Sequence, residues 1–328
     1  MSRLLSVELR RFFARRITRW TGVALLVGVI AVGIGTFASS SNDLAAAHRS
    51  AQRTAEQFQQ QQQAAIQDCK AHVPPDQADQ CGAGEPGPTA SSFYRDPRFS
   101  FHDHVQDLLG TGTVIGSLVG LLLAASLIGA EWQAGTFAAL LTWEPRRPRV
   151  AAAKVAAVVI GSVAIAAVAT AALVGVEAIV AATHGTFRTV LQDFHPKPHF
   201  ALRTWAMAGR GALVVALVTA LGAALALLLR HTVAAVGVAI GYLIVGEGII
   251  GSLRHGDVRH HLLQSRLDAL LNGTYTWPIP IRTADGGEGF SPEHIAVVHA
   301  FAAGLEVVAV AAVLLLIATA VLQRRDVT

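Results

Sequence analysis

Long apolar stretches recur along this chain and divide it into membrane-length segments. Each is roughly 20 residues or more, the length that an α-helix needs to cross about 30 Å of hydrocarbon. Alanine and leucine dominate these stretches, without the alternation typical of barrel strands, so the pattern predicts an all-α membrane protein with six transmembrane helices. The predicted spans are 21–37, 109–130, 151–182, 205–229, 232–252 and 295–323.

Composition and charge agree with this class and predict an orientation. The chain is 52% hydrophobic and only 15% charged, a balance that a soluble domain of 328 residues does not tolerate. Arginines gather before the first span, between spans two and three, and in the tail 324–328, whereas the connectors 38–108 and 253–294 also carry acids. The positive-inside rule therefore places both termini in the cytoplasm. The net charge of +4 reflects this rule and does not indicate nucleic-acid binding.

Residues 1–20 have the pattern of an amphipathic helix lying in the cytoplasmic interface of the bilayer. A cleaved secretory signal is the alternative, but the basic region is long and five further spans follow it. The apolar face holds Leu4, Leu5, Leu9, Phe12, Phe13 and Ile17, and the basic face holds Arg3, Arg10, Arg11 and Arg15.

Both external connectors are predicted to contain structure. In 38–108, the polar stretch 42–67 is a predicted helix, and 70–92 is irregular because it is rich in proline and glycine. Cys69 and Cys81 lie in this connector, where an oxidising compartment favours a disulfide worth ~3 kcal/mol; the alternative is two free thiols. In the insert 253–294, leucines at helical spacing predict a helix that Asn272–Gly273 ends.

The cytoplasmic connector 131–150 is the most informative stretch for function. It is long enough for a short helix, on which Phe137, Leu140 and Leu141 share a face suited to a groove on a partner. Basic residues follow at Arg146, Arg147, Arg149 and Lys154, and they can pair with acids or lipid phosphates. We expect a cytoplasmic partner to grip this segment. The alternative is an interfacial helix that contacts only lipid.

The sequence contains no catalytic constellation. No lysine follows a glycine, so the phosphate-binding P-loop is absent, and so is the His-Glu-x-x-His zinc motif. Histidines occur without cysteine or carboxylate at metal-ligand spacing. We therefore expect no enzymatic activity, no metal site and no cofactor on this chain.

Ionisable residues inside the predicted spans are Glu177, Arg210, Glu247 and Glu306. Because charges in hydrocarbon are costly, such residues usually face partners or water. Their predicted depths allow Arg210 to pair with Glu177 or Glu247. Two interpretations remain open: an ion pair that stabilises helix packing, or acids that line an exit path for cationic or zwitterionic amphiphiles.

The connector resembles the cytoplasmic signature of the membrane-spanning subunits of type-2 ATP-binding-cassette (ABC) exporters. In that family an acidic residue ends span two, Gly-Thr and paired leucines follow on a short helix, and a Pro/Arg turn leads to a lysine that opens span three. The matching residues are Glu131, Gly135, Thr136, Leu140, Leu141, Pro145, Arg149 and Lys154. Trp143 and Glu144 depart from this pattern, and the first external connector is unusually long.

The resemblance implies a bacterial cell-membrane exporter in which two such subunits, identical or related, pair with two separate ATPase subunits. ATP and Mg would bind to those partners, which would grip 131–154. A proton-coupled secondary transporter is the alternative, although it predicts internal repeats and none is evident. A membrane scaffold or sensor without transport is a third option.

Overall fold

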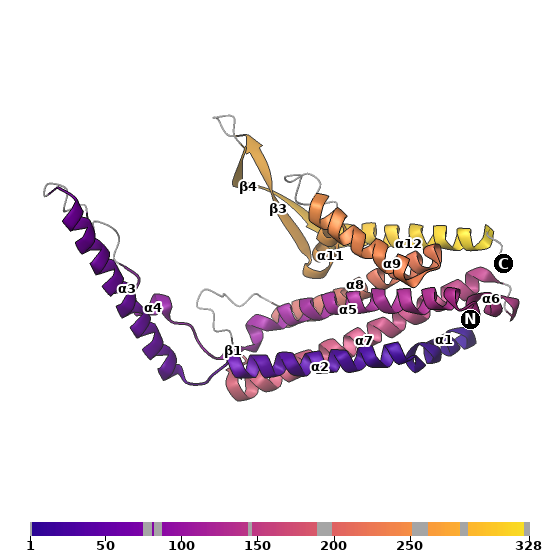
Figure 1. Ribbon diagram of the computed structural model, residues 1–328, viewed down its shortest axis with the longest axis horizontal. Helices are drawn as coiled ribbons and strands as arrows, with labels where there is room; N and C mark the ends of the chain where they lie inside the picture. The colour runs from indigo at the N-terminus through magenta and orange to yellow at the C-terminus, as the bar shows by residue number, and fades with distance from the viewer. Residues whose placement is uncertain are drawn as a thin grey trace. The chain divides into compact units, whose positions relative to one another are not determined.

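A computed structural model of the chain describes residues 2–74, 81, 87–143, 146–188, 199–250, 262–282 and 288–324. Within this described part, six helical stretches are long and apolar enough to cross a membrane, which confirms the predicted fold class (Figure 1). They are α2 (Arg16–Ser39), α5 (Phe101–Gln133), α7 (Arg147–His184), α8 (Phe200–Leu229), α9 (Thr232–Gly241) with the π-helical segment Tyr242–Ile250, and α12 (Ala300–Arg324).

Most helices run beyond the apolar stretches that predicted them. Both α5 and α7 continue into polar residues at their ends, because backbone hydrogen bonding does not stop where the hydrocarbon does. Arg230 and His231 link α8 to α9, and the left-handed φ of 54° at Arg230 ends α8. The fifth span changes from an α-helix to a π-helix at Tyr242, a change that its sequence pattern did not indicate.

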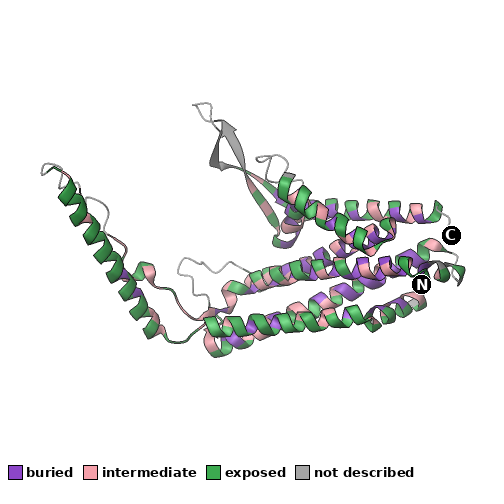
Figure 2. Cartoon of the chain, viewed as in Figure 1, coloured by how far each residue is buried: buried purple, intermediate pink, exposed green. Residues whose placement is uncertain are grey.

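The chain divides into two compact units, and the larger comprises Met1–Ile30, His104–Gly175 and Pro196–Thr328. Its core lies where α5, α7 and α8 run side by side (Figure 1). Gly116 of α5 permits this close approach: a Cβ there would lie 2.7 Å from the Cβ of Ala166 and 3.3 Å from Val215. Apolar side chains stay exposed on α2 and α12, as expected of lipid-facing surfaces (Figure 2).

The amphipathic segment 1–20 forms two helices, α1 (Ser2–Ala14) and the start of α2. Within the larger unit α1 packs against protein, because Phe12 is only 1% exposed and its ring fills the space beside Gly161. Phe13 and Ile17 of the predicted apolar face remain exposed. The interfacial position of this segment stays a prediction.

The insert before the last span contains the predicted helix and an unpredicted hairpin. Helix α11 (Leu263–Asn272) ends at Gly273, whose φ is +100°, as the Asn-Gly signal indicated. Strands β3 (Thr274–Arg282) and β4 (Glu288–His299) then pair antiparallel, so the prediction that span six begins at Ile295 is wrong. A short apolar run fits strand and helix equally well, and its pairing with β3 decides between them.

The smaller unit comprises Ala31–Asp103 and Val176–His195. Its long helix α3 (Leu44–His72) confirms the predicted polar helix and begins at Asp43, whose Oδ1 accepts a hydrogen bond from the Ala46 amide at 2.8 Å. Helix α4 (Ala90–Phe93) packs on α3, with the rings of Phe58 and Phe93 5.9 Å apart. Strand β1 (Phe99–Ser100) pairs in parallel with β2 (Gly185–Thr186).

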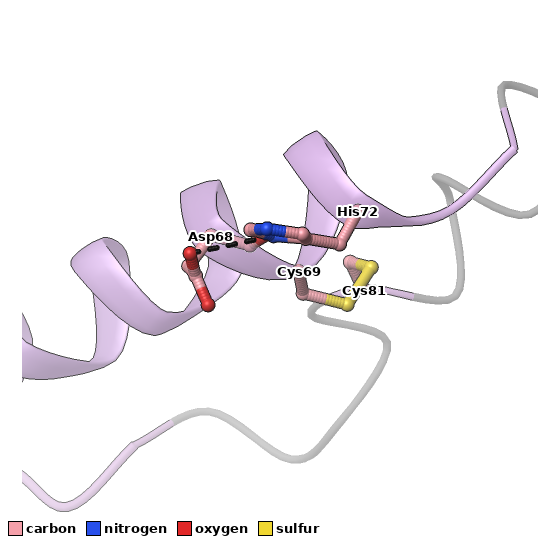
Figure 3. The surroundings of a disulfide bond; sticks show 4 residues. All are labelled: Asp68, Cys69, His72 and Cys81. Atoms are coloured by element: carbon pink, nitrogen blue, oxygen red, sulfur yellow. Dashed lines mark hydrogen bonds and ion pairs between the residues drawn. A yellow bond between two sulfur atoms is a disulfide. The ribbon is translucent and has the colours of Figure 1, made fainter.

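Two local features stabilise this smaller unit. Cys69 and Cys81 form the predicted disulfide, with their Cα atoms 5.9 Å apart (Figure 3), so the alternative of two free thiols is wrong. Arg98 Nη2 lies 2.6 Å from Asp96 Oδ2, and hydrogen bonding from this guanidinium lowers the pKa of the Asp96 carboxyl. Asp96 is therefore held as a carboxylate near neutral pH.

Candidate functional site

The connector between α5 and α7 folds into a short helix, α6 (Thr136–Trp143). The chain turns into it at Gly135, whose φ of +69° is readily adopted only by glycine. The Thr136 hydroxyl then donates a hydrogen bond to the Glu131 carbonyl at 3.2 Å. The Gly-Thr pair of the sequence signature therefore makes the sharp turn and satisfies a carbonyl at the end of α5.

Lys154 of α7 stands at the centre of a buried ion cluster. Its Nζ lies 2.5 Å from Glu131 Oε2, and 3.1 and 3.2 Å from the two carboxylate oxygens of Glu8. Lys154 and Glu8 are each 1% exposed and Glu131 is 8% exposed. The acid and the lysine that begin and end the signature thus contact each other, and Glu8 links Lys154 to α1.

Arg11 of α1 and Arg15, which lies between α1 and α2, complete the cluster. Arg15 Nη2 lies 2.6 Å from Glu131 Oε1, and Arg11 Nη1 lies 3.4 Å from Glu8 Oε1. Two buried carboxylates thus face Lys154 and two arginines, which compensates their loss of hydration. We name Glu8, Glu131, Lys154, Arg11 and Arg15 the ion cluster.

Sequence reasoning missed Glu8. It is the one acidic residue in 1–20, and it lies one helical turn from both Leu4 and Phe12 on the apolar face. A lone acid among apolar neighbours is a signal for a buried basic partner. The position of that partner, 146 residues further along the chain, could not be read from the local pattern.

Phe137 faces the interior of this chain. It is 0% exposed, its ring stacks on Trp132 with centroids 4.3 Å apart, and Lys154 Nζ lies 5.7 Å from its centroid. The expectation that Phe137 lies on the partner-facing side of α6 is therefore wrong, because the core of its own chain takes up that face. Leu140 is half-buried against the same core. The side chain of Leu141, and Pro145, lie outside the described residues.

The exposed side of α6 borders an open cleft of about 550 Å³. Thr136 and Ala139 of α6 line it, together with Arg11 and Arg15. Glu131, Lys154, Leu140 and Ala14 complete the lining. A cleft lined by small side chains and by arginines suits a partner segment that carries a carboxylate.

The three predicted connector arginines lie at the start of α7 and line a different pocket from the one beside the ion cluster. Arg147 Nη1 donates hydrogen bonds to the carbonyls of Leu322 and Gln323 at 2.9 and 3.4 Å, which ties α7 to the end of α12. Arg146 and Arg149 are exposed. The connector therefore has two chemically different surfaces, the α6 cleft and this basic turn.

Glu306 and Glu247 are bound by partners other than Arg210. Glu306 Oε2 lies 2.9 Å from Nε of Arg266, a buried residue of α11. Glu247 Oε1 accepts hydrogen bonds from the Tyr242 hydroxyl at 3.0 Å and the Gln264 amide at 2.9 Å. Of the two pairings predicted for Arg210, the one with Glu247 is wrong, because Tyr242 of the same span and the Gln264 amide of α11 bind Glu247 instead. The sequence did not place α11 beside the spans.

Glu177 lies in the smaller unit and is 1% exposed. Its Oε1 accepts a hydrogen bond from the Thr36 hydroxyl of α2 at 2.9 Å. No hydrogen bond within the described residues reaches its buried Oε2. The structure does not test whether Arg210 reaches Glu177, so that pairing stays a prediction.

Comparison with known proteins gives one match. The model of a family described as ABC-2 membrane transporter related matches residues 44–254, which include α6, Lys154 and Glu177. No curated protein and no solved structure matches the chain.

Proposed function

We propose, because this chain belongs to the ABC-2 membrane transporter related family, that it is the membrane-spanning subunit of an ATP-driven exporter in a bacterial cell membrane. Membership makes the chain a multi-pass permease component of ABC type. Two such subunits, identical or related, work with two separate ATPase subunits that hold ATP and Mg. The ATPase docks on the cytoplasmic segment 131–154.

The ion cluster is the observation that carries this proposal. It joins α1 to the end of α5 and to the start of α7. These two helices precede and follow α6 in the sequence. Separating buried charges is costly, so these elements resist being pulled apart and move as one. A displacement of α6 by a partner would then reach two membrane spans together, which is what coupling ATP hydrolysis to transport requires.

The α6 cleft provides the docking chemistry. Thr136 and Ala139 are small and exposed, so a partner segment can approach the backbone of α6 closely. Arg11 and Arg15 beside them can pair with carboxylates of that segment. Arg15 already holds Glu131, so a carboxylate that engages Arg15 also acts on the ion cluster.

Ala139→Asp tests this docking site, with Thr142→Asp as the matched control. Both positions are exposed on α6, but only Ala139 lines the cleft. A carboxylate at 139 would repel an acidic partner segment, so we expect Ala139→Asp to abolish co-purification of the ATPase and ATP-driven transport, while Thr142→Asp retains both. Normal co-purification with Ala139→Asp, or equal loss in the two variants, would refute docking in the cleft.

The energy source is tested by measuring transport in membrane vesicles that contain both subunits. Transport by an exporter of this class should stop with a catalytically inactive ATPase partner and continue after a protonophore collapses the proton gradient. The reverse result would favour a proton-coupled secondary transporter.

A further inference from the structure

We propose that the basic turn at the start of α7 is a binding site for the phosphate-bearing headgroup of an anionic phospholipid. Arg146, Arg147, Pro148 and Arg149 line an open pocket of about 400 Å³ there, together with Gln323 at the end of α12. This pocket lies in the same connector as the α6 cleft but shares no lining residue with it.

Arg147 builds the pocket. Its guanidinium bonds to the carbonyls of Leu322 and Gln323, which lie in the last turn of α12. The last carbonyls of a helix have no partner within that helix, so Arg147 satisfies them and holds the ends of α7 and α12 together. Arg146 and Arg149, the other two arginines that line the pocket, remain exposed.

Arg146 and Arg149 supply the binding charge. Both side chains are exposed, and within the described residues neither makes an ion pair or hydrogen bond. By sequence, residues 144–149 and 324–326 hold five arginines against two acids, a net charge of +3. The positive end of the α7 dipole adds to this field. Arginine pairs well with phosphate, because its fork of donors can bind two oxygens at once.

The location of the pocket favours a lipid headgroup over a soluble phosphate as its ligand. The pocket lies where two candidate spans end, so it stands at the level of the lipid headgroups whichever way the protein is oriented. Below it, α12 exposes Leu316, Ile317 and Val313, at 68%, 47% and 53%. Gln323 is seven residues from Leu316, about 10 Å along the helix. A headgroup bound by the arginines can therefore lay its acyl chains on this apolar face.

The test is a lipid-binding titration of the purified full-length protein in detergent. Dioleoyl phosphatidylglycerol should bind more tightly than dioleoyl phosphatidylcholine, and native mass spectrometry should resolve the bound lipid. Arg146→Gln with Arg149→Gln should weaken phosphatidylglycerol binding about thirty-fold, from roughly 1 kcal/mol per arginine near an anionic surface. Arg146→Lys with Arg149→Lys should retain most of the affinity, because lysine keeps the charge.

Arg53→Gln with Arg203→Gln is the matched control, since both arginines are exposed and Arg203 lies in the first turn of α8. Equal loss in this control would mean that surface charge alone binds lipid and would overturn the proposal. Competition by inorganic phosphate at the lipid's own concentration would show a free-anion site instead. Unchanged lipid binding by the Gln variant, with loss of ATPase co-purification, would assign these arginines to the partner.

Discussion

Replacing Lys154 with methionine is the sharpest test of the ion cluster. Methionine fills nearly the same volume, so the change removes a charge from a buried site and preserves most of the packing. Glu131 would keep Arg15 at 2.6 Å, whereas Glu8 would keep only Arg11, 3.4 Å away and 51% exposed in its side chain. Removing one partner of a buried ion pair costs about 3–5 kcal/mol, so we expect a loss of that order.

A second substitution separates charge from packing. Glu8→Gln in the Lys154→Met background removes the carboxylate that was left without its main partner. We expect it to restore more than half of the lost stability, because a neutral amide is cheaper to bury than an uncompensated carboxylate. Thermal unfolding in detergent, followed by intrinsic fluorescence, would show a fall in the melting temperature on the order of 10 °C for Lys154→Met, and partial recovery in the double variant.

A transport assay tests whether the ion cluster is also needed for function. The double variant should recover stability and membrane insertion but not ATP-driven transport, because α1 is no longer tied to α7 by charge. Non-additive stability effects are the signature of residues in one network. If the double variant is less stable than Lys154→Met alone, or if Lys154→Met is as stable as the wild type, the cluster does not act as described.

Three further predictions concern the connector between α2 and α5 and the contact of α11 with α12. Alkylation of the intact, non-reduced protein should find no free thiol at Cys69 or Cys81, and replacing both with serine should cost ~3 kcal/mol in the chain-entropy model. Glu306→Gln should cost under about 1 kcal/mol because Glu306 is 53% exposed, whereas Arg266→Ala, at a buried position, should lower the melting temperature clearly more. The pKa of Asp96 in the folded protein is depressed below its ordinary value of 3.8. Its stabilising contribution is therefore present above pH 3.8 and is lost as the pH falls through the folded pKa. Asp96→Asn should flatten this acid dependence of the melting temperature.

Only part of the candidate site could be predicted from the sequence. The pattern placed a short helix between spans two and three and singled out Glu131 and Lys154, because helix periodicity and signature spacing are local properties. It did not show that these two residues contact each other, and it placed Phe137 on the wrong side. Which face of an apolar helix is buried depends on what packs beside it, here Trp132 and the core of the larger unit.

By itself, the sequence determined the membrane class, the number of spans, the disulfide and the end of α11 at Gly273. These follow from local free energies: the transfer of about 20 apolar residues into hydrocarbon, the closure of a short loop, and the φ that glycine tolerates. Only the tertiary structure decided that Glu8 meets Lys154, that Arg266 meets Glu306, and that the residues before α12 form a strand. A buried charge is stable only beside a compensating group, and residues distant in sequence supply that group once the helices have packed.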